Sequence, residues 1–151
     1  MKFVTRDHIG IDRVAVPWLI RRFVDPKAEF IFVPINQVLD VAKREGAISF
    51  DLHCEGEIDH KDNKCSFEAA VARYGITDIA IVEMAKLVHA SDIAADKDTV
   101  SEAAGLKAIT LGFQRLYTDD NDRLVNEFPI YDALYAYYQL KLQERIAVPT
   151  Y

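Results

Sequence analysis

Residues 2–33 read KFVTRDHIGIDRVAVPWLIRRFVDPKAEFIFV, and this stretch decides the fold that we expect for the chain. Lys2 to Thr5 is expected as a short starter or edge strand. Asp12 to Phe23 is expected as a helix, because its apolar residues recur near helical spacing and Asp12 suits the N-cap. Pro17 either kinks this helix or belongs to the first turn of a helix that starts later. Glu29 to Val33, rich in Phe, Ile and Val, is typical of a buried strand.

The same alternation continues outward from this stretch. Asn36 to Glu45 is helix-like and stops at Gly46, a common residue at helix C-termini, and Ala47 to Leu52 is expected as a third strand. His53 to Lys64 is polar and is expected as a loop. Three or four helices are expected after it, at Ser66 to Tyr74, Asp78 to His89, Ser101 to Tyr117 and about Tyr131 to Ile146. The sequence therefore predicts an α/β (α+β) fold, with a small N-terminal sheet and interleaved helices followed by a helical C-terminal layer.

Length, composition and charge limit the class of protein to which the chain can belong. Residues 1–151 are expected to form a single domain, since no linker or repeat divides them. The chain has 18 Lys and Arg against 24 Asp and Glu, a net charge of −6, so direct nucleic-acid binding is not expected. No apolar run approaches the roughly 18 residues that cross a bilayer, and the first residues do not resemble a signal peptide. We therefore expect a cytoplasmic protein in which Cys54 and Cys65 are free thiols or ligands.

Arginines gather near the N-terminus and form the first candidate site. Arg6 follows the first strand, where α/β folds commonly place ligands. Arg13 and Arg21 are two helical turns apart and can point to one side of their helix. Guanidinium groups suit oxyanions and carboxylates, so Arg6, Arg13 and Arg21 are candidates for anion binding. The alternative is a solvated face with ordinary local salt bridges.

The second candidate site is a loop rich in metal-binding side chains. Residues 53–65 hold two histidines, two cysteines and four carboxylates, which are the donors of transition-metal sites, but their spacing follows no strict motif. His60 and Cys65 could face one point, with Glu57 or Glu68 as a third ligand. Downstream, His89 and Asp92 lie at i and i+3 on one helix face. The sequence thus predicts a transition-metal site from His60, Cys65, Glu57, His89 and Asp92, with zinc, iron or manganese not distinguished; the alternative is a solvated acidic turn.

Two weaker patterns remain. Cys65 begins a helix beside Lys64, an environment that would lower a thiol pKa and favour a nucleophile. The C-terminal third is rich in tyrosine, which is more often amphipathic packing than a ligand site. We assign these tyrosines to the core or to a homodimer face on the last helix.

Residues 12–23, DRVAVPWLIRRF, form the most specific stretch of a resemblance that covers nearly the whole chain. By this stretch the chain resembles the ChrB-type chromate-resistance domain, as a stand-alone C-terminal domain. The likeness is also carried by Val4-Thr5-Arg6, Ile11, Asp25-Pro26, Phe30-Ile31-Phe32-Val33-Pro34, Arg44-Glu45-Gly46-Ala47, Phe50-Asp51, His60, Cys65-Ser66-Phe67-Glu68, Tyr74-Gly75-Ile76, Leu87-Val88-His89, Asp92, Glu102-Ala103-Ala104-Gly105-Leu106, Leu116-Tyr117 and Tyr131-Asp132-Ala133-Leu134-Tyr135-Ala136.

This resemblance implies a role in chromate resistance beside a chromate efflux transporter, as part of a stress response. Longer members are described as chromate-sensitive regulators in which this domain follows an additional N-terminal region that the present sequence lacks. Two functions therefore stay open. The first is a binding or sensing module for chromate, sulfate or a related oxyanion, with or without a transition metal. The second is a metal-dependent enzyme of unknown substrate that uses the His60 and Cys65 loop beside an arginine-lined anion pocket.

Overall fold

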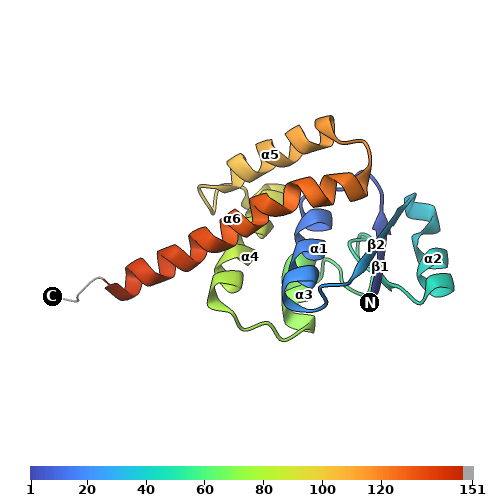
Figure 1. Ribbon diagram of the computed structural model, residues 1–151, viewed down its shortest axis with the longest axis horizontal. Helices are drawn as coiled ribbons and strands as arrows, with labels where there is room; N and C mark the ends of the chain where they lie inside the picture. The colour runs from blue at the N-terminus through green and yellow to red at the C-terminus, as the bar shows by residue number, and fades with distance from the viewer. Residues whose placement is uncertain (148–151) are drawn as a thin grey trace.

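The computed structural model describes residues 1–147, which form a small parallel sheet with a large helical layer on one side (Figure 1). The sheet has the order β2-β1-β3, with β1 (Lys2–Arg6) between β2 (Glu29–Val33) and β3 (Ile48–Ser49). Both pairings are parallel, and Phe3 lies opposite Phe30 on β2 and Ile48 on β3. The predicted fold class is confirmed, because helices α1 and α2 connect the strands and the remaining helices follow them.

The alternation of side chains along β1 divides the core in two. Val4 faces a small cluster with Val38 and Val41 of α2 (Val38–Glu45), which covers one face of the sheet. Phe3 points to the opposite face and joins the main core with α1 (Asp12–Phe23). In Figure 1, α2 lies on one side of the sheet, while α1 and the other long helices lie on the opposite side.

The helical layer contains α3 (Ser66–Arg73), α4 (Ile79–Asp92), α5 (Ala103–Leu116) and α6 (Asp120–Ala147), with short 3-10 turns at Ile35–Gln37 and Ala94–Asp96. Helix α6 starts about eleven residues earlier than the sequence predicts and includes Pro129. Proline cannot donate to the carbonyl of Val125. Both residues lie on the exposed face of α6, where water can satisfy that carbonyl, so the helix continues through them.

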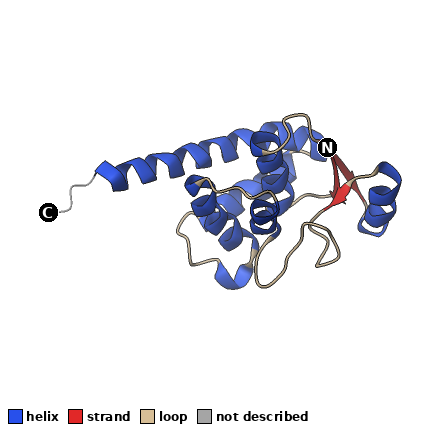
Figure 2. Ribbon diagram, turned by 90° about the horizontal axis from the view of Figure 1, so that it is seen from below, coloured by secondary structure: helices blue, strands red, loops and turns tan. Residues whose placement is uncertain are grey.

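The tyrosines of α6 divide between core and surface. Tyr131 is fully buried, Tyr138 is nearly so, and Tyr135 donates to Asp78 at 2.7 Å. Tyr137 is 39% exposed. The helix extends past the body of the molecule in both views (Figure 2), and a homodimer face on it stays a prediction. Within residues 1–147, no helix is both long and apolar enough to span a membrane.

A buried polar network ties α5 and α6 to the loop between β1 and α1. Arg123 and Glu127 of α6 are 1% and 0% exposed, and Arg123 Nε donates to Glu127 Oε2 at 2.7 Å. Thr110 of α5 donates to the other oxygen of Glu127, while Arg123 and Gln114 both donate to the carbonyl of Ile9. Two donors, one from α5 and one from α6, therefore hold the loop that leads into α1.

We expect the substitution Glu127→Ala to lower the free energy of unfolding by about 3–5 kcal/mol, because it leaves the Arg123 guanidinium buried without its counter-charge. Urea denaturation followed by circular dichroism measures the change. Glu144→Ala, at an exposed position of the same helix, is the matched control and should change stability by less than about 0.5 kcal/mol. Equal effects of the two substitutions would contradict a structural role for the network.

Candidate metal centre

Three carboxylates from distant parts of the chain surround one imidazole nitrogen. Nε2 of His60 lies 3.2 Å from Asp12 Oδ2, 3.2 Å from Asp51 Oδ1 and 3.3 Å from Asp92 Oδ2. Asp12 begins α1, Asp51 follows β3, His60 lies in the loop before α3, and Asp92 ends α4. We call these four residues the carboxylate centre.

The distances suit the ligands of one metal ion. Ligands around an ion with bonds of about 2.1 Å lie about 3.0 Å apart in octahedral and about 3.4 Å apart in tetrahedral coordination. The three Nε2–oxygen distances fall inside this range. A single N–H of His60 can donate well to one oxygen only, so a hydrogen bond alone does not account for three nearly equal contacts. The arrangement of Asp12, Asp51 and His60 could therefore hold an ion.

The N-terminus of α3 positions two of the carboxylates. The backbone N–H groups of Ser66 and Phe67 donate to the two oxygens of Asp12, at 2.5 Å and 3.3 Å. The hydroxyl of Ser66 donates to Asp51 Oδ1 at 3.0 Å. Asp12 does not cap its own helix α1, as its position in the sequence suggested; it satisfies the first N–H groups of α3 instead.

Asp51 is held in an unusual backbone conformation. Its φ is +54°, a left-handed value that is uncommon for a residue other than glycine. The turn ends the pairing of β3 with β1 and leaves the third strand shorter than predicted. Arg13 Nε lies 3.2 Å and Arg6 Nη2 lies 3.7 Å from Asp51 Oδ2. The side chain of Asp51 thus lies between the other ligands and two arginines.

The loop that carries His60 is organised around Asp59. This carboxylate is 7% exposed and accepts hydrogen bonds from the backbone N–H groups of Leu52, Gly56 and His60. A side chain at Gly56 would approach Asp59 Oδ2 to 2.9 Å and the Phe50 backbone to 3.3 Å. Glycine at that position therefore lets the loop fold tightly enough for Asp51 and His60 to meet.

Burial and mutual repulsion shift the pKa values in the centre. Complete burial raises the pKa of Asp12, and contact with His60 offsets this only in part. Burial acts in the same direction on Asp51, but His60, Arg13 and Ser66 outweigh it and hold its pKa below the ordinary value. Burial also raises the pKa of Asp92 to about 6, with repulsion from Asp12 and Asp51 adding to it. Hydrogen bonding to Asp12 and Asp51 raises the pKa of His60 to about 10, so without a metal the imidazole is a cation among carboxylates.

A second group of potential ligands lies beside the first. Ligand atoms of Cys65, Glu68 and His89 lie within 4.8 Å of one another. Cys65 precedes Ser66, and His89 is one helical turn before Asp92, so the two groups are neighbours on α3 and α4. Cys65 is fully buried, and this burial raises its pKa instead of lowering it. The prediction of an activated thiolate nucleophile at Cys65 was therefore wrong.

The other residues singled out from the sequence lie elsewhere. Glu57 is exposed and pairs with Arg73 at 3.2 Å, outside both groups. Arg21 donates to the carbonyl of Ala28 and stacks over Phe30, so it shares no contact with Arg6 or Arg13. His60 and Asp92 meet in the carboxylate centre, whereas Cys65 and His89 belong to the second group.

The sequence did not single out Asp12 or Asp51 as ligands. The positions just after a strand and just before a helix were the only local signals for them.

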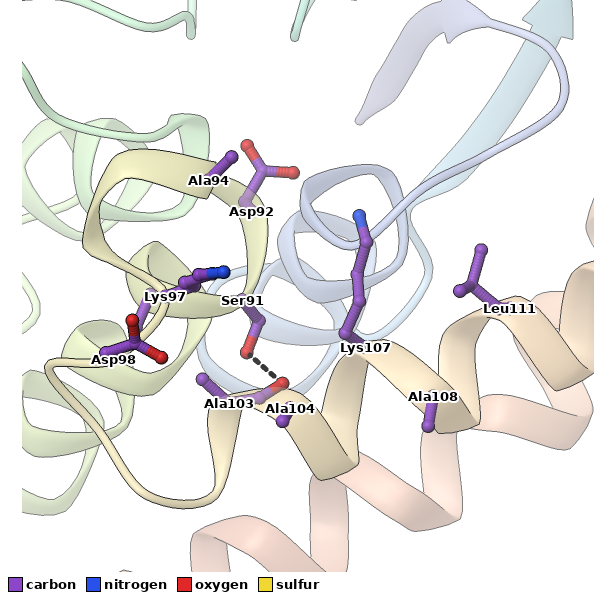
Figure 3. A pocket seen from close by; sticks show the side chains of 11 residues that line it. Ser91, Asp92, Ala94, Lys97, Asp98, Ala103, Ala104, Lys107, Ala108 and Leu111 are labelled. Atoms are coloured by element: carbon purple, nitrogen blue, oxygen red, sulfur yellow. Dashed lines mark hydrogen bonds between the residues drawn. The ribbon is translucent and has the colours of Figure 1, made fainter.

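A cavity of about 450 Å³ adjoins the carboxylate centre (Figure 3). Asp92 forms part of its wall, together with Lys97 and Lys107. The rest of the lining is largely small and apolar, contributed by Ala90, Ala94, Ala103, Ala104, Ala108 and Leu111. Lys107 is close enough to Asp92 to act against the rise of its pKa. A small molecule with an apolar body and an anionic group would fit such a lining.

Fold and site together define an α/β protein with a partly buried carboxylate–histidine centre next to a thiol-containing group of potential ligands. Residues 3–138 match the family described as ChrB, C-terminal domain, and the chain belongs to this family. It is similar to Protein ChrB of Cupriavidus metallidurans, with 30% identity over 139 residues. The alignment covers 91% of this chain and 40% of that protein, so the chain spans well under half of the relative's length. No solved structure matches.

We expect only one of the two cysteines to react with a thiol reagent in the folded, metal-free protein. Cys54 is exposed and Cys65 is fully buried with a raised pKa, so a chromogenic disulfide should label Cys54 at once and Cys65 only after unfolding. The Cys54→Ser variant should therefore show no fast phase. A fast phase in this variant, equal to that in denaturant, would contradict the burial of Cys65.

Proposed function

We propose that this ChrB-family domain binds a divalent transition-metal ion at Asp12, Asp51, His60 and Asp92 and, once loaded, a small oxyanion at Arg6 and Arg13. The observation that carries the proposal is the convergence of three carboxylates on one imidazole nitrogen at 3.2–3.3 Å. The family resemblance supports chromate or sulfate as the oxyanion, and a sensing or detoxifying role in chromate resistance.

The donor set favours an ion of the manganese or iron class. Carboxylate oxygens suit Mn²⁺, and imidazole suits iron and zinc, whereas thiolate-rich sites select zinc or Cu(I). The carboxylate centre offers oxygen donors and one nitrogen, with no sulfur among its four residues. When bound, the ion would supply positive charge and polarise an oxygen ligand. Arg6 and Arg13 would orient the anion beside it.

Charge balance makes anion binding depend on the metal. Without a metal, the protonated His60 and the two guanidinium groups together balance the three carboxylates, so the centre has no net charge to attract an oxyanion. A divalent ion that displaces the His60 proton would convert this to one net positive charge. A donor is available for the anion, because Arg6 Nε is buried without a hydrogen-bond partner among the described residues, while Arg13 Nε faces Asp51 Oδ2 at 3.2 Å.

The other candidate function is a metal-dependent enzyme, and the cavity beside Asp92 favours it. A volume of about 450 Å³ exceeds the needs of a tetrahedral oxyanion and suits a small organic substrate. Lys97 or Lys107 would then pair with an anionic group of that substrate. Under either function, the proposal places the domain in the cytoplasm, without direct contact to nucleic acid and with α6 as the face for a homodimer.

We expect His60→Ala and Asp92→Asn to weaken Mn²⁺ binding about 100-fold or more, because changes that merely support a ligand already cost about 10–100-fold. Isothermal titration calorimetry on chelator-treated protein measures the affinity. Among the described residues, His60 is the only ion-pair partner of the Asp92 carboxylate, so its replacement by asparagine, which has a similar size, should leave the fold intact.

The matched control is Glu57→Gln, which removes a carboxylate from the same loop but outside the centre. It should bind Mn²⁺ as the unmodified protein does. Unchanged affinity in Asp92→Asn, or an equal loss in Glu57→Gln, would show that the ion binds elsewhere.

We expect sulfate to raise the melting temperature of the Mn²⁺-loaded protein by about 5–10 °C at a concentration near 100 times its Kd. Arg13→Ala should abolish the shift, since it removes a guanidinium from the anion site. The metal-free protein should show no shift, because its centre has no net positive charge.

Arg44→Ala is the control for this experiment, since that arginine is 69% exposed and pairs only with Glu45 among the described residues. A sulfate shift of the same size with and without Mn²⁺ would contradict metal-dependent anion binding while leaving the metal site itself in place.

A further inference from the structure

The group of Cys65, Glu68 and His89 has the properties of a site in its own right, and we call it the thiol site. The three side chains come from the N-terminus of α3 and the last turns of α4. Their ligand atoms lie within 4.8 Å of one another, and none of them belongs to the carboxylate centre. Sulfur, oxygen and nitrogen donors at these distances match the composition of many zinc sites.

Helix capping does not explain why position 65 is a cysteine. Cys65 occupies the N-cap of α3, where its side chain accepts from the backbone N–H of Glu68, and Glu68 Oε2 accepts from the N–H of Cys65 at 2.8 Å. Serine, threonine, aspartate and asparagine are the residues preferred at this position. A cysteine there provides a sulfur donor that capping does not need.

The imidazole of His89 is fixed with Nδ1 toward the other two ligands. Its Nε2 lies 2.8 Å from Asp96 Oδ2, and its Nδ1 lies 2.7 Å from Glu68 Oε2. A carboxylate that accepts from the remote nitrogen of a histidine is the usual support of a metal-bound imidazole. With an ion in the site, Asp96 would hold the proton on Nε2 and leave the Nδ1 lone pair to the ion.

Solvent reaches the thiol site through a cavity of about 380 Å³. Its lining includes Glu68 and His89 themselves, with Asp96, Lys86, Thr99 and Val100 around them. Cys65 lies behind this lining and is fully buried. An ion held by three protein side chains at the base of the cavity would keep its fourth position open to water or another small ligand.

We propose that Cys65, Glu68 and His89 form a second metal site of the zinc class, distinct from the carboxylate centre and open at one coordination position. Binding of hydrated Zn²⁺ would release the thiol proton of Cys65 and the Nδ1 proton of His89 to solvent. Three bonds to the ion, from the Cys65 sulfur, the His89 nitrogen and a Glu68 oxygen, would replace bonds from the ion to water. The thiolate makes the site softer than the carboxylate centre, so the two sites prefer different ions.

Titration of the full chain with Co²⁺ tests this inference, because cobalt bound to a thiolate shows a near-ultraviolet charge-transfer band that oxygen and nitrogen ligands do not produce. We expect the band in the unmodified protein and in Cys54→Ser. We expect it to be absent in Cys65→Ser, whose hydroxyl keeps the helix cap. His89→Gln should weaken Co²⁺ binding at this band about 100-fold or more, and it keeps Cys65 in place should the serine variant fold poorly.

The same titration distinguishes metal binding at the thiol site from metal binding at the carboxylate centre of the proposed function. Asp92→Asn should keep the charge-transfer band while losing the Mn²⁺ affinity of the carboxylate centre. Cys65→Ser should lose the band and keep the Mn²⁺ affinity of the carboxylate centre. Absence of the band in the unmodified protein, or its persistence in Cys65→Ser, would overturn the thiol site and leave the carboxylate centre untouched.

Discussion

The carboxylate of Asp12 connects the two halves of the structure. It begins α1, is almost fully buried, and accepts hydrogen bonds from the first two N–H groups of α3. A buried carboxylate requires such partners, since an unpaired one would lose its hydration without compensation. Because Ser66 also donates to Asp51, the same helix end fixes a second carboxylate. The approach of α3 to α1 therefore creates both the packing of the helical layer and the acidic surroundings of His60.

Two chemically different ligand groups arise from adjacent positions on the same two helices. On α3, Cys65 belongs to one group while Ser66 supports the other; on α4, His89 and Asp92 divide in the same way. In each group an imidazole lies among carboxylates, and these carboxylates raise the pKa of His60 and of His89 against the effect of burial. In the absence of metal, the His60 imidazolium provides the positive charge that an ion would otherwise bring.

The fold could be predicted from the sequence further than the site could. The strands and α1 follow from local apolar patterns, and Glu29–Val33 and Asp12–Phe23 have the predicted bounds. The start of α6 was missed because a proline such as Pro129 usually interrupts a helix, whereas here burial of one helix face against the core stabilises the helix on both sides of it. Asp12 resembled an ordinary helix cap, and its true partners lie more than fifty positions away. Glu57 could not be distinguished from the other potential ligands of its loop, because composition shows which donor side chains are present but not the direction in which the backbone points each of them.

The carboxylate centre collects its ligands from four separate segments of the chain, at the start of α1, the end of β3, the loop before α3 and the end of α4. An ion bound there would cross-link these segments in the folded protein and close three successive loops. Because the site is assembled only on folding, the free energy of metal binding would add to the stability of the folded state. A cell that withdraws the metal would then change the lifetime of the protein as well as its chemistry, since the released segments become more accessible to proteases.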